Sequence, residues 1–352
     1  MKKGEIDFGL LDKKVEDFIN SNFDIKDIEK NFKKSIKKKD LIDIIETLEK
    51  NRLYNGIEED GFSKRLDIRW GKLFNKISYI IDFSFYSIYE GQQFIDRSNV
   101  RNHVLLKLHS KQILLAKEIL ILLRNGYGEG ANARWRSLYE NVVITLFISN
   151  NGNELAKRFL EHKNIFNYKE SLKYKDSYKK LKHRGYGKDN FKELEEEKER
   201  LLKKYGKSFF GDYGWITDDI LKNKNFTEIE KIVDMAHFKP YFSLSSRSIH
   251  SSSKSFDNLG KRNDDLNLIG PSNIGLIDPI QNTTMFLMKG ATFILIDFIK
   301  QLDDKDIKNK IILLYFTKIL IGLDISTGKE AIKVQDEIDR DEILLNEFEN
   351  EK

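Results

Sequence analysis

Two side chains that could do phosphate or acid–base chemistry together are Arg136 and Glu140. They stand four positions apart in an apolar pattern of helical period, so they share one face of a helix. The arginine could bind an anion, and the glutamate could orient it or act as a base. A structural or surface ion pair is the alternative. Arg134 lies on a neighbouring stripe of the same helix and is a further candidate for binding.

A second candidate site lies in residues 241–250, directly after a proline, which is favoured at helix starts. On such a helix Ser246 and His250 share a face. Histidine is the side chain most easily tuned near neutral pH, so His250 is the candidate general acid or base. Arg247 could contact a phosphate, and Tyr241 and Ser246 are candidate binding residues. The alternative is a histidine with only a structural role. A serine nucleophile would also need a third catalytic group and an oxyanion hole, and the sequence shows neither.

A third candidate is a run of basic residues interleaved with tyrosines. Residues 169–188 hold eight basic side chains against two acidic ones, a net charge of +6. Lys173, Lys179 and Lys180 could bind phosphates, and tyrosine rings can stack on unpaired bases. RNA is therefore a candidate partner, and a solvated lysine-rich helix face is the alternative.

Other patterns exclude classes of chemistry. The glycine-rich stretch at 126–130 follows a helical pattern and not a strand, so it predicts a hairpin turn between helices and not a phosphate loop. His237 has no acidic pair at metal-ligand spacing, and we expect no metal and no cofactor. Cysteine is absent, which excludes disulfides and thiolate nucleophiles.

The elements that must position these residues are helices. All three prolines lie beyond position 239, so the first two thirds of the chain can run as helix after helix. Strand signals are scarce. Apolar periodicity predicts long helices near 72–94, 101–124, 129–149, 153–181, 280–302 and 307–323. The predicted fold class is therefore all-α, a multi-helix antiparallel bundle.

The predicted organisation has three parts: an N-terminal helical appendage at 1–60, a main bundle at 61–325 and a charged, acidic tail at 326–352. The glycines near 56–61 suggest a linker between the first two parts. Charged residues interrupt the most apolar stretches, so we expect core helices and no membrane span. No apolar leader follows the first lysines, and a cytoplasmic protein is expected. Long apolar helices also favour a homodimer, without showing which face pairs.

Two segments together carry a family resemblance. Residues 133–140 resemble an Arg-Ser-Leu-x-Glu helix, and residues 241–250 resemble a later Tyr…Ser…His signature. They are similar to an uncharacterised helical family of bacteria and archaea, over about 72–323. A looser similarity is to the HEPN class of helical proteins, many of which are ribonucleases in toxin–antitoxin and antiviral systems. Their motif has an arginine and a histidine a few residues apart, and Arg247 and His250 stand closer than that motif requires.

The leading hypothesis is a defence or toxin-type effector that acts on RNA as a metal-independent ribonuclease. His250 would be the general acid or base, Arg136 or Arg247 would stabilise the phosphate, and Glu140 would orient the arginine. A second hypothesis is a non-catalytic module that binds a protein partner through the loop at 251–278 and the acidic tail. A third is a sensor of a small molecule or nucleotide.

Overall fold

The computed structural model describes residues 38–185, 187–247, 261–263, 266–267 and 270–350. The chain divides into two compact units, Met1–Ile68 and Arg69–Lys352. Helix α3 (Lys38–Gly91) crosses this division, so the linker expected near 56–61 is wrong and the backbone there is helical. A glycine inside a helix costs only about 1 kcal/mol relative to alanine, so two of them do not end a long helix.

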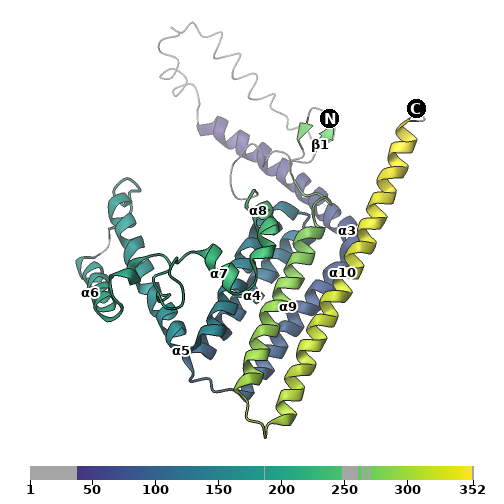
Figure 1. Cartoon of the computed structure of the whole chain (residues 1–352). Coiled ribbons are helices and arrows are strands. Elements are labelled where there is room, and N and C mark those ends of the chain that lie inside the picture. Colours follow the sequence, from purple (N-terminus) through teal and green to yellow (C-terminus); the bar gives the residue numbers. More distant parts are fainter. Residues whose placement is uncertain (1–37, 186, 248–260, 264–265, 268–269, 351–352) are drawn as a thin grey trace. The chain divides into compact units, whose positions relative to one another are not determined.

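The second unit is a bundle of long helices, which confirms the all-α prediction (Figure 1). Besides the C-terminal part of α3, its long members are α4 (Val100–Arg124), α5 (Gly128–Ser177), α9 (Ile277–Gln301) and α10 (Ile307–Asn350). Helix α4 packs along α5, and α9 packs against α4, α5 and α10. The fully buried rings of Trp70, Trp135, Tyr139 and Phe286 are among the largest side chains in the core.

Shorter elements connect the long helices. They are η2 (Gln92–Phe94), α6 (Lys188–Tyr205), η3 (Lys207–Phe210), α7 (Phe226–Ile232), η4 (Ala236–Phe238), α8 (Lys239–Arg247), β1 (Lys261–Asn263) and β2 (Leu266–Asn267). The two strands pair antiparallel within the proline-marked segment, where the sequence predicts irregular structure. They are too short to change the fold class.

Helix α5 has one break in its helical geometry. Gly152 has φ 80° and ψ −173°, a left-handed φ that favours glycine. The sequence predicts two helices separated near this position, and the backbone breaks there as expected. The break divides α5 into a first half with Arg136 and Glu140 and a second half with the basic run.

The glycine-rich stretch at 126–130 forms the turn between α4 and the start of α5, as the sequence predicts. Gly126 has a φ of 75°, and its carbonyl oxygen accepts a hydrogen bond of 2.9 Å from the amide of Ser272. A Cβ atom added at Gly128 would lie 2.6 Å from the carbonyl oxygen of Gly275. The backbone of 272–275 therefore covers this turn, and only a glycine allows so close an approach.

A layer of polar side chains crosses the core between α4, α5 and α9. The amide nitrogen of Gln112 donates to the Asn141 side-chain oxygen at 3.0 Å and to the Thr145 hydroxyl at 2.9 Å. A Cβ atom at Gly290 of α9 would lie 2.4 Å from the Gln112 side-chain oxygen. His109 completes the layer, with Nε2 3.2 Å from the carbonyl oxygen of Ser84.

By length and composition alone, α9 and residues Ile307–Asp341 of α10 could cross a membrane. Core helices of soluble proteins pass the same test, so this is weak evidence. In α9, 61% of the apolar window is buried inside the structure, as the sequence predicts for a core helix. In α10 only 22% is buried, so this helix keeps an apolar side in solvent that the sequence analysis did not anticipate.

Candidate functional site

Arg136 and Glu140 form an ion pair on the first half of α5. The Arg136 Nε lies 3.1 Å from Glu140 Oε1, and the two side chains are 25% and 44% exposed. The Arg136 guanidinium also lies over the ring of Phe242 in α8, 4.5 Å from its centroid. A half-exposed pair of this kind contributes little to stability. It does leave a cation at the junction of α5 and α8, which a ligand can reach.

Beneath this pair lies a buried hydrogen bond that sequence reasoning missed. The Tyr139 hydroxyl donates to Glu230 Oε1 at 2.6 Å and lies 3.1 Å from the carbonyl oxygen of Met235. Burial raises the pKa of Tyr139, with the neighbouring Glu230 as a further cause, so the phenol stays protonated. Glu230 is 2% exposed, and no sequence signal marks it because its partner stands on a distant helix.

Tyr213 adds a second phenol to this region. Burial raises the pKa of Tyr213, and the charge of Glu140 raises it further. Glu140 and Glu230 both act on Tyr213, so carboxylates from α5 and α7 lie near one phenol. The group in this arrangement that can hold a polar ligand is Arg136, because Tyr139 is fully buried and its hydroxyl is engaged by Glu230.

Tyr139→Phe should destabilise the fold by about 2 kcal/mol, because it leaves the buried Glu230 carboxylate without its donor. The variant with both Tyr139→Phe and Glu230→Leu should lose less than the sum of the two single changes, by at least about 1 kcal/mol. Urea unfolding of the four proteins measures this coupling. Tyr79→Phe, at an exposed tyrosine of α3, is the matched control and should be neutral. Strictly additive losses would contradict the assigned hydrogen bond.

The residues of α8 that were candidates for chemistry have separate surroundings. The Ser246 hydroxyl donates to the carbonyl oxygen of Phe242 at 2.8 Å, within its own helix. Tyr241 is exposed. Arg247 is the last residue of α8, and its side chain and His250 lie outside what the structure describes. The predicted pairing of Ser246 with His250 therefore stays a prediction.

Arg134 does not join Arg136. Its guanidinium pairs with Glu118 of α4, on a different side of α5. The contact between α5 and α8 is instead made by Phe242 and by Ser245, whose hydroxyl lies 3.3 Å from the Asn132 side-chain oxygen. The structure thus brings the two candidate segments together, but not through Arg134.

The C-terminal part of α5 and the turn after it, residues 169–184, form a basic surface that we call the basic end. Lys173, Lys179 and Lys180 are exposed, and no acidic partner at ion-pair distance is found for them within the described ranges. The rings of Tyr174 and Tyr178 stack with centroids 6.3 Å apart. Both side chains are half-buried, and the Tyr174 hydroxyl donates to the carbonyl oxygen of Arg184 at 2.7 Å.

The basic end and the Arg136–Glu140 pair lie on different halves of α5. The break at Gly152 separates them, and within the described residues no hydrogen bond or ion pair joins the two. The candidate residues therefore form two sites and not one. The sequence analysis assigned them to a single activity. Periodicity predicts which residues share a helix face, but it does not predict the path of a long helix through the fold.

Arg158 and His162, also on α5, bind the chain after α6. The Arg158 Nε donates to the Trp215 carbonyl oxygen at 2.8 Å, and its Nη2 donates to that of Gly214 at 3.0 Å. The His162 Nε2 lies 3.0 and 2.9 Å from the carbonyl oxygens of Phe209 and Gly211, so it is the donor. Burial lowers the pKa of His162. Both side chains are buried and hold this loop against α5.

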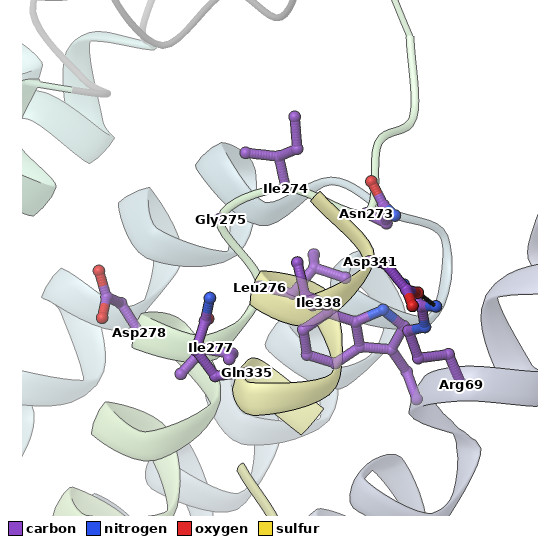
Figure 2. Close-up of a pocket in the computed structure, with 11 residues that line it drawn as sticks. Arg69, Asn273, Ile274, Gly275, Leu276, Ile277, Asp278, Gln335, Ile338 and Asp341 are labelled. Atoms are coloured by element: carbon purple, nitrogen blue, oxygen red, sulfur yellow. Dashed lines mark hydrogen bonds and ion pairs between the residues drawn. The ribbon is translucent and has the colours of Figure 1, made fainter. Parts of the chain in front are cut away.

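A hollow of about 440 Å³ lies where the loop before α9 meets α3 and α10. Figure 2 shows Asn273 on the loop, Asp278 at the start of α9, and Gln335, Ile338 and Asp341 on α10 around it. An ion pair between Arg69 of α3 and Asp341 closes one side. The described parts of the loop at 251–278 and of the acidic tail thus lie side by side. Among the described residues, no group of His, Asp and Glu could hold a metal ion.

Comparison with known proteins gives one match. Residues 102–267 match the model of a family of unknown function (DUF5677). No curated protein and no solved structure matches the chain. The matched range contains both segments that carry the family resemblance, 133–140 and 241–250, and it is narrower than the expected 72–323. The chain therefore carries an uncharacterised domain that begins in α4, ends after α8 and includes both candidate sites.

Proposed function

We propose that the protein acts on RNA and that single-stranded RNA binds along the basic end of α5. The observation that carries the proposal is the group of three exposed lysines, Lys173, Lys179 and Lys180, around the stacked rings of Tyr174 and Tyr178. Lysines neutralise phosphates and release counterions, which supplies affinity without sequence preference. Tyrosine rings beside them can stack on unpaired bases.

The charge of the basic end itself supports this assignment. The only acidic side chains of the basic end by sequence are Glu170 and Asp176, against six lysines and one arginine. Lys169 is paired with Asp212 at 2.8 Å, and the Lys175 ammonium lies 4.3 Å from the Phe191 centroid. The remaining lysines are left to solvent and to a polyanion.

The proposal extends to metal-independent cleavage, as in an effector of the defence or toxin type, of an RNA long enough to reach from the basic end to the Arg136–Glu140 pair. His250 would remove the proton of a ribose 2′-hydroxyl, and the 2′ oxygen would attack the adjacent phosphorus while the bond to the 5′ oxygen breaks. The leaving 5′ oxygen would take its proton from water. Arg136 or Arg247 would stabilise the charge on the phosphate, and Glu140 would orient Arg136. The 3.1 Å contact between Arg136 and Glu140 supports this last role. The likeness to HEPN ribonucleases stays a prediction.

Cleavage is tested by incubating the protein with mixed RNA in the presence of a chelator. We expect fragments that end in a 2′,3′-cyclic phosphate, and we expect His250→Ala and Arg136→Ala to reduce the rate at least about 100-fold. RNA affinity should stay unchanged in both variants, because neither residue belongs to the basic end that supplies the phosphate contacts. Equal inertness of the native protein and both variants, with RNA still bound, would remove the cleavage step and leave the binding step.

The second candidate function is that of a non-catalytic module that binds a protein partner. The hollow favours it, because residues 273–278, in the loop before α9 and at the start of that helix, line the same space as Gln335, Ile338 and Asp341 of α10. In this case Arg136 and Glu140 would be structural. Glu140→Ala would then lower the melting temperature and any cellular effect in parallel, whereas a site residue would lose the effect at an unchanged melting temperature.

A further inference from the structure

The side of α10 that faces away from α9 carries a continuous apolar stripe. Its members are Ile307, Ile311, Leu314, Ile321, Ile325 and Ile332, each between 42% and 62% exposed. The opposite side of the helix is buried, with Leu313, Leu320 and Val334 in the core. The stripe therefore has no role in the packing of the described chain.

The spacing of the stripe is that of a helix-pairing seam. Its positions are separated by alternating steps of four and three residues, with Lys318 and Gly328 in the two remaining places. A repeat of this kind keeps one line of side chains facing a second helix along its whole length. A lipid bilayer imposes no such period, and Lys318 would lie in its hydrocarbon interior.

Two glycines of α10 also indicate that a second helix packs against this stripe. Gly322 and Gly328 lie in the helix interior, and a Cβ atom at either would meet nothing within 4 Å. Each glycine costs up to about 1 kcal/mol of helix stability relative to alanine, and no neighbour in the described chain requires it. Close approach of an external helix would account for both.

The area of the stripe suits a protein interface. Eight large apolar side chains of α10 leave about half of their surface in solvent, the six of the stripe together with Tyr315 and Ile319 beside it. If each large side chain has a surface of roughly 150 Å², the exposed apolar area of these eight side chains is about 600 Å². One partner of a standard specific interface contributes about 800 Å², and typical monomers expose no apolar patch larger than about 600 Å².

We propose that the stripe is the interface of a homodimer in which α10 pairs antiparallel with α10 of a second copy. With the two-fold axis between Lys318 and Ile321, every seam position meets another seam position. Ile307 then faces Ile332 of the second copy, and Ile311 faces Gly328. A single stripe that complements itself in this way needs no other protein.

Lys318 favours the antiparallel direction. Parallel pairing in register would place Lys318 opposite Lys318 of the second copy, with two like charges in the seam, whereas antiparallel pairing places it opposite Ile321.

The mass of the full chain in solution tests the pairing. Light scattering should give twice 41.4 kDa at micromolar concentration. Leu314→Asp together with Ile321→Asp should give the monomer mass, with unchanged helix content because both side chains are exposed. Ile121→Asp, at an exposed isoleucine of α4, is the matched control and should stay dimeric. A monomeric native protein would overturn the proposal, as would a dimer that both aspartates leave intact.

Direction is tested by cysteine substitution in a chain that has no cysteine of its own. Ile307→Cys combined with Ile332→Cys should give a disulfide-linked dimer on oxidation, because antiparallel pairing places these positions opposite each other. Ile307→Cys alone should give none, because the two copies of this position lie about 38 Å apart along the seam. A covalent dimer of the single variant would overturn the antiparallel arrangement. Flotation of the native protein with anionic phospholipid vesicles, lost in the double aspartate variant, would assign the stripe to a membrane instead.

Discussion

Reversing the charge of Lys173, Lys179 and Lys180 to glutamate is expected to weaken binding of single-stranded RNA by at least about 100-fold at low salt. The change removes three phosphate contacts and adds three repulsive charges at the surface of the basic end. All three side chains are exposed, so the fold and its melting temperature should not change. Fluorescence anisotropy with a labelled, unstructured RNA measures the dissociation constant directly.

The matched control for this variant lies on α4. Lys107, Lys111 and Lys117 are also exposed, and their reversal changes the net charge of the chain by the same amount. If general electrostatic attraction caused binding, both triple variants would lose affinity equally. We expect the α4 variant to stay within about threefold of the native protein, because its charges lie outside the basic end. Equal losses in the two variants would contradict a localised RNA surface.

The stability of the fold should fall in mild acid because of His109. Burial lowers the pKa of His109 to about 4, well below its ordinary value of 6.5. The imidazole lies in the polar layer between the Ser84 carbonyl oxygen and the Gln112 side chain, and no carboxylate is among its hydrogen-bond partners. The unfolded chain therefore takes up a proton below about pH 6.5, and the folded chain does so only near pH 4. The contribution of His109 to stability is present in full above about pH 6.5, the pKa in the unfolded chain. It is lost as the pH falls toward about 4, the pKa in the folded chain.

The expected size of this loss is about 2.5 kcal/mol between pH 7 and about pH 4.5. Burial lowers the pKa of His162 as well, which adds a loss of the same sign. Urea unfolding at several pH values measures the total. His109→Gln should flatten the dependence, whereas His103→Gln, at an exposed histidine of the same helix, should leave it unchanged. A pH dependence that survives His109→Gln in full would show that the imidazole is accessible to water in the folded protein.

The sequence predicts where helices occur better than it predicts how long they are. Apolar periodicity places both the turn after α4 and the break in α5, and Gly126 marks the turn. The structure has a left-handed φ at Gly126 and at Gly152. The same residue type misleads near 56–61, where α3 continues through two glycines. The end of the last helix near 323 is also wrong, since α10 continues to Asn350. Tertiary packing on one side of a helix overrides the weak propensities of single residues.

The candidate sites, like the helices, can be predicted from the sequence only in part. The Arg136–Glu140 pair follows from a spacing of four residues, and the exposure of the lysines follows from their charge. The hydrogen bond between Tyr139 and Glu230 does not, because its partners are separated by 91 residues and meet only through the packing of α7 on α5. The distance between Arg136 and the basic end likewise depends on the path of a long helix. Contacts of this kind need the tertiary structure.

The most direct test of RNA binding is the dissociation constant of the native protein for single-stranded RNA, measured over a range of salt concentrations. Three phosphates held by Lys173, Lys179 and Lys180 predict that the logarithm of affinity falls with the logarithm of salt with a slope of about −2 or steeper. Affinity that is absent at low salt, or that does not change with salt, would contradict the assignment of the basic end to RNA.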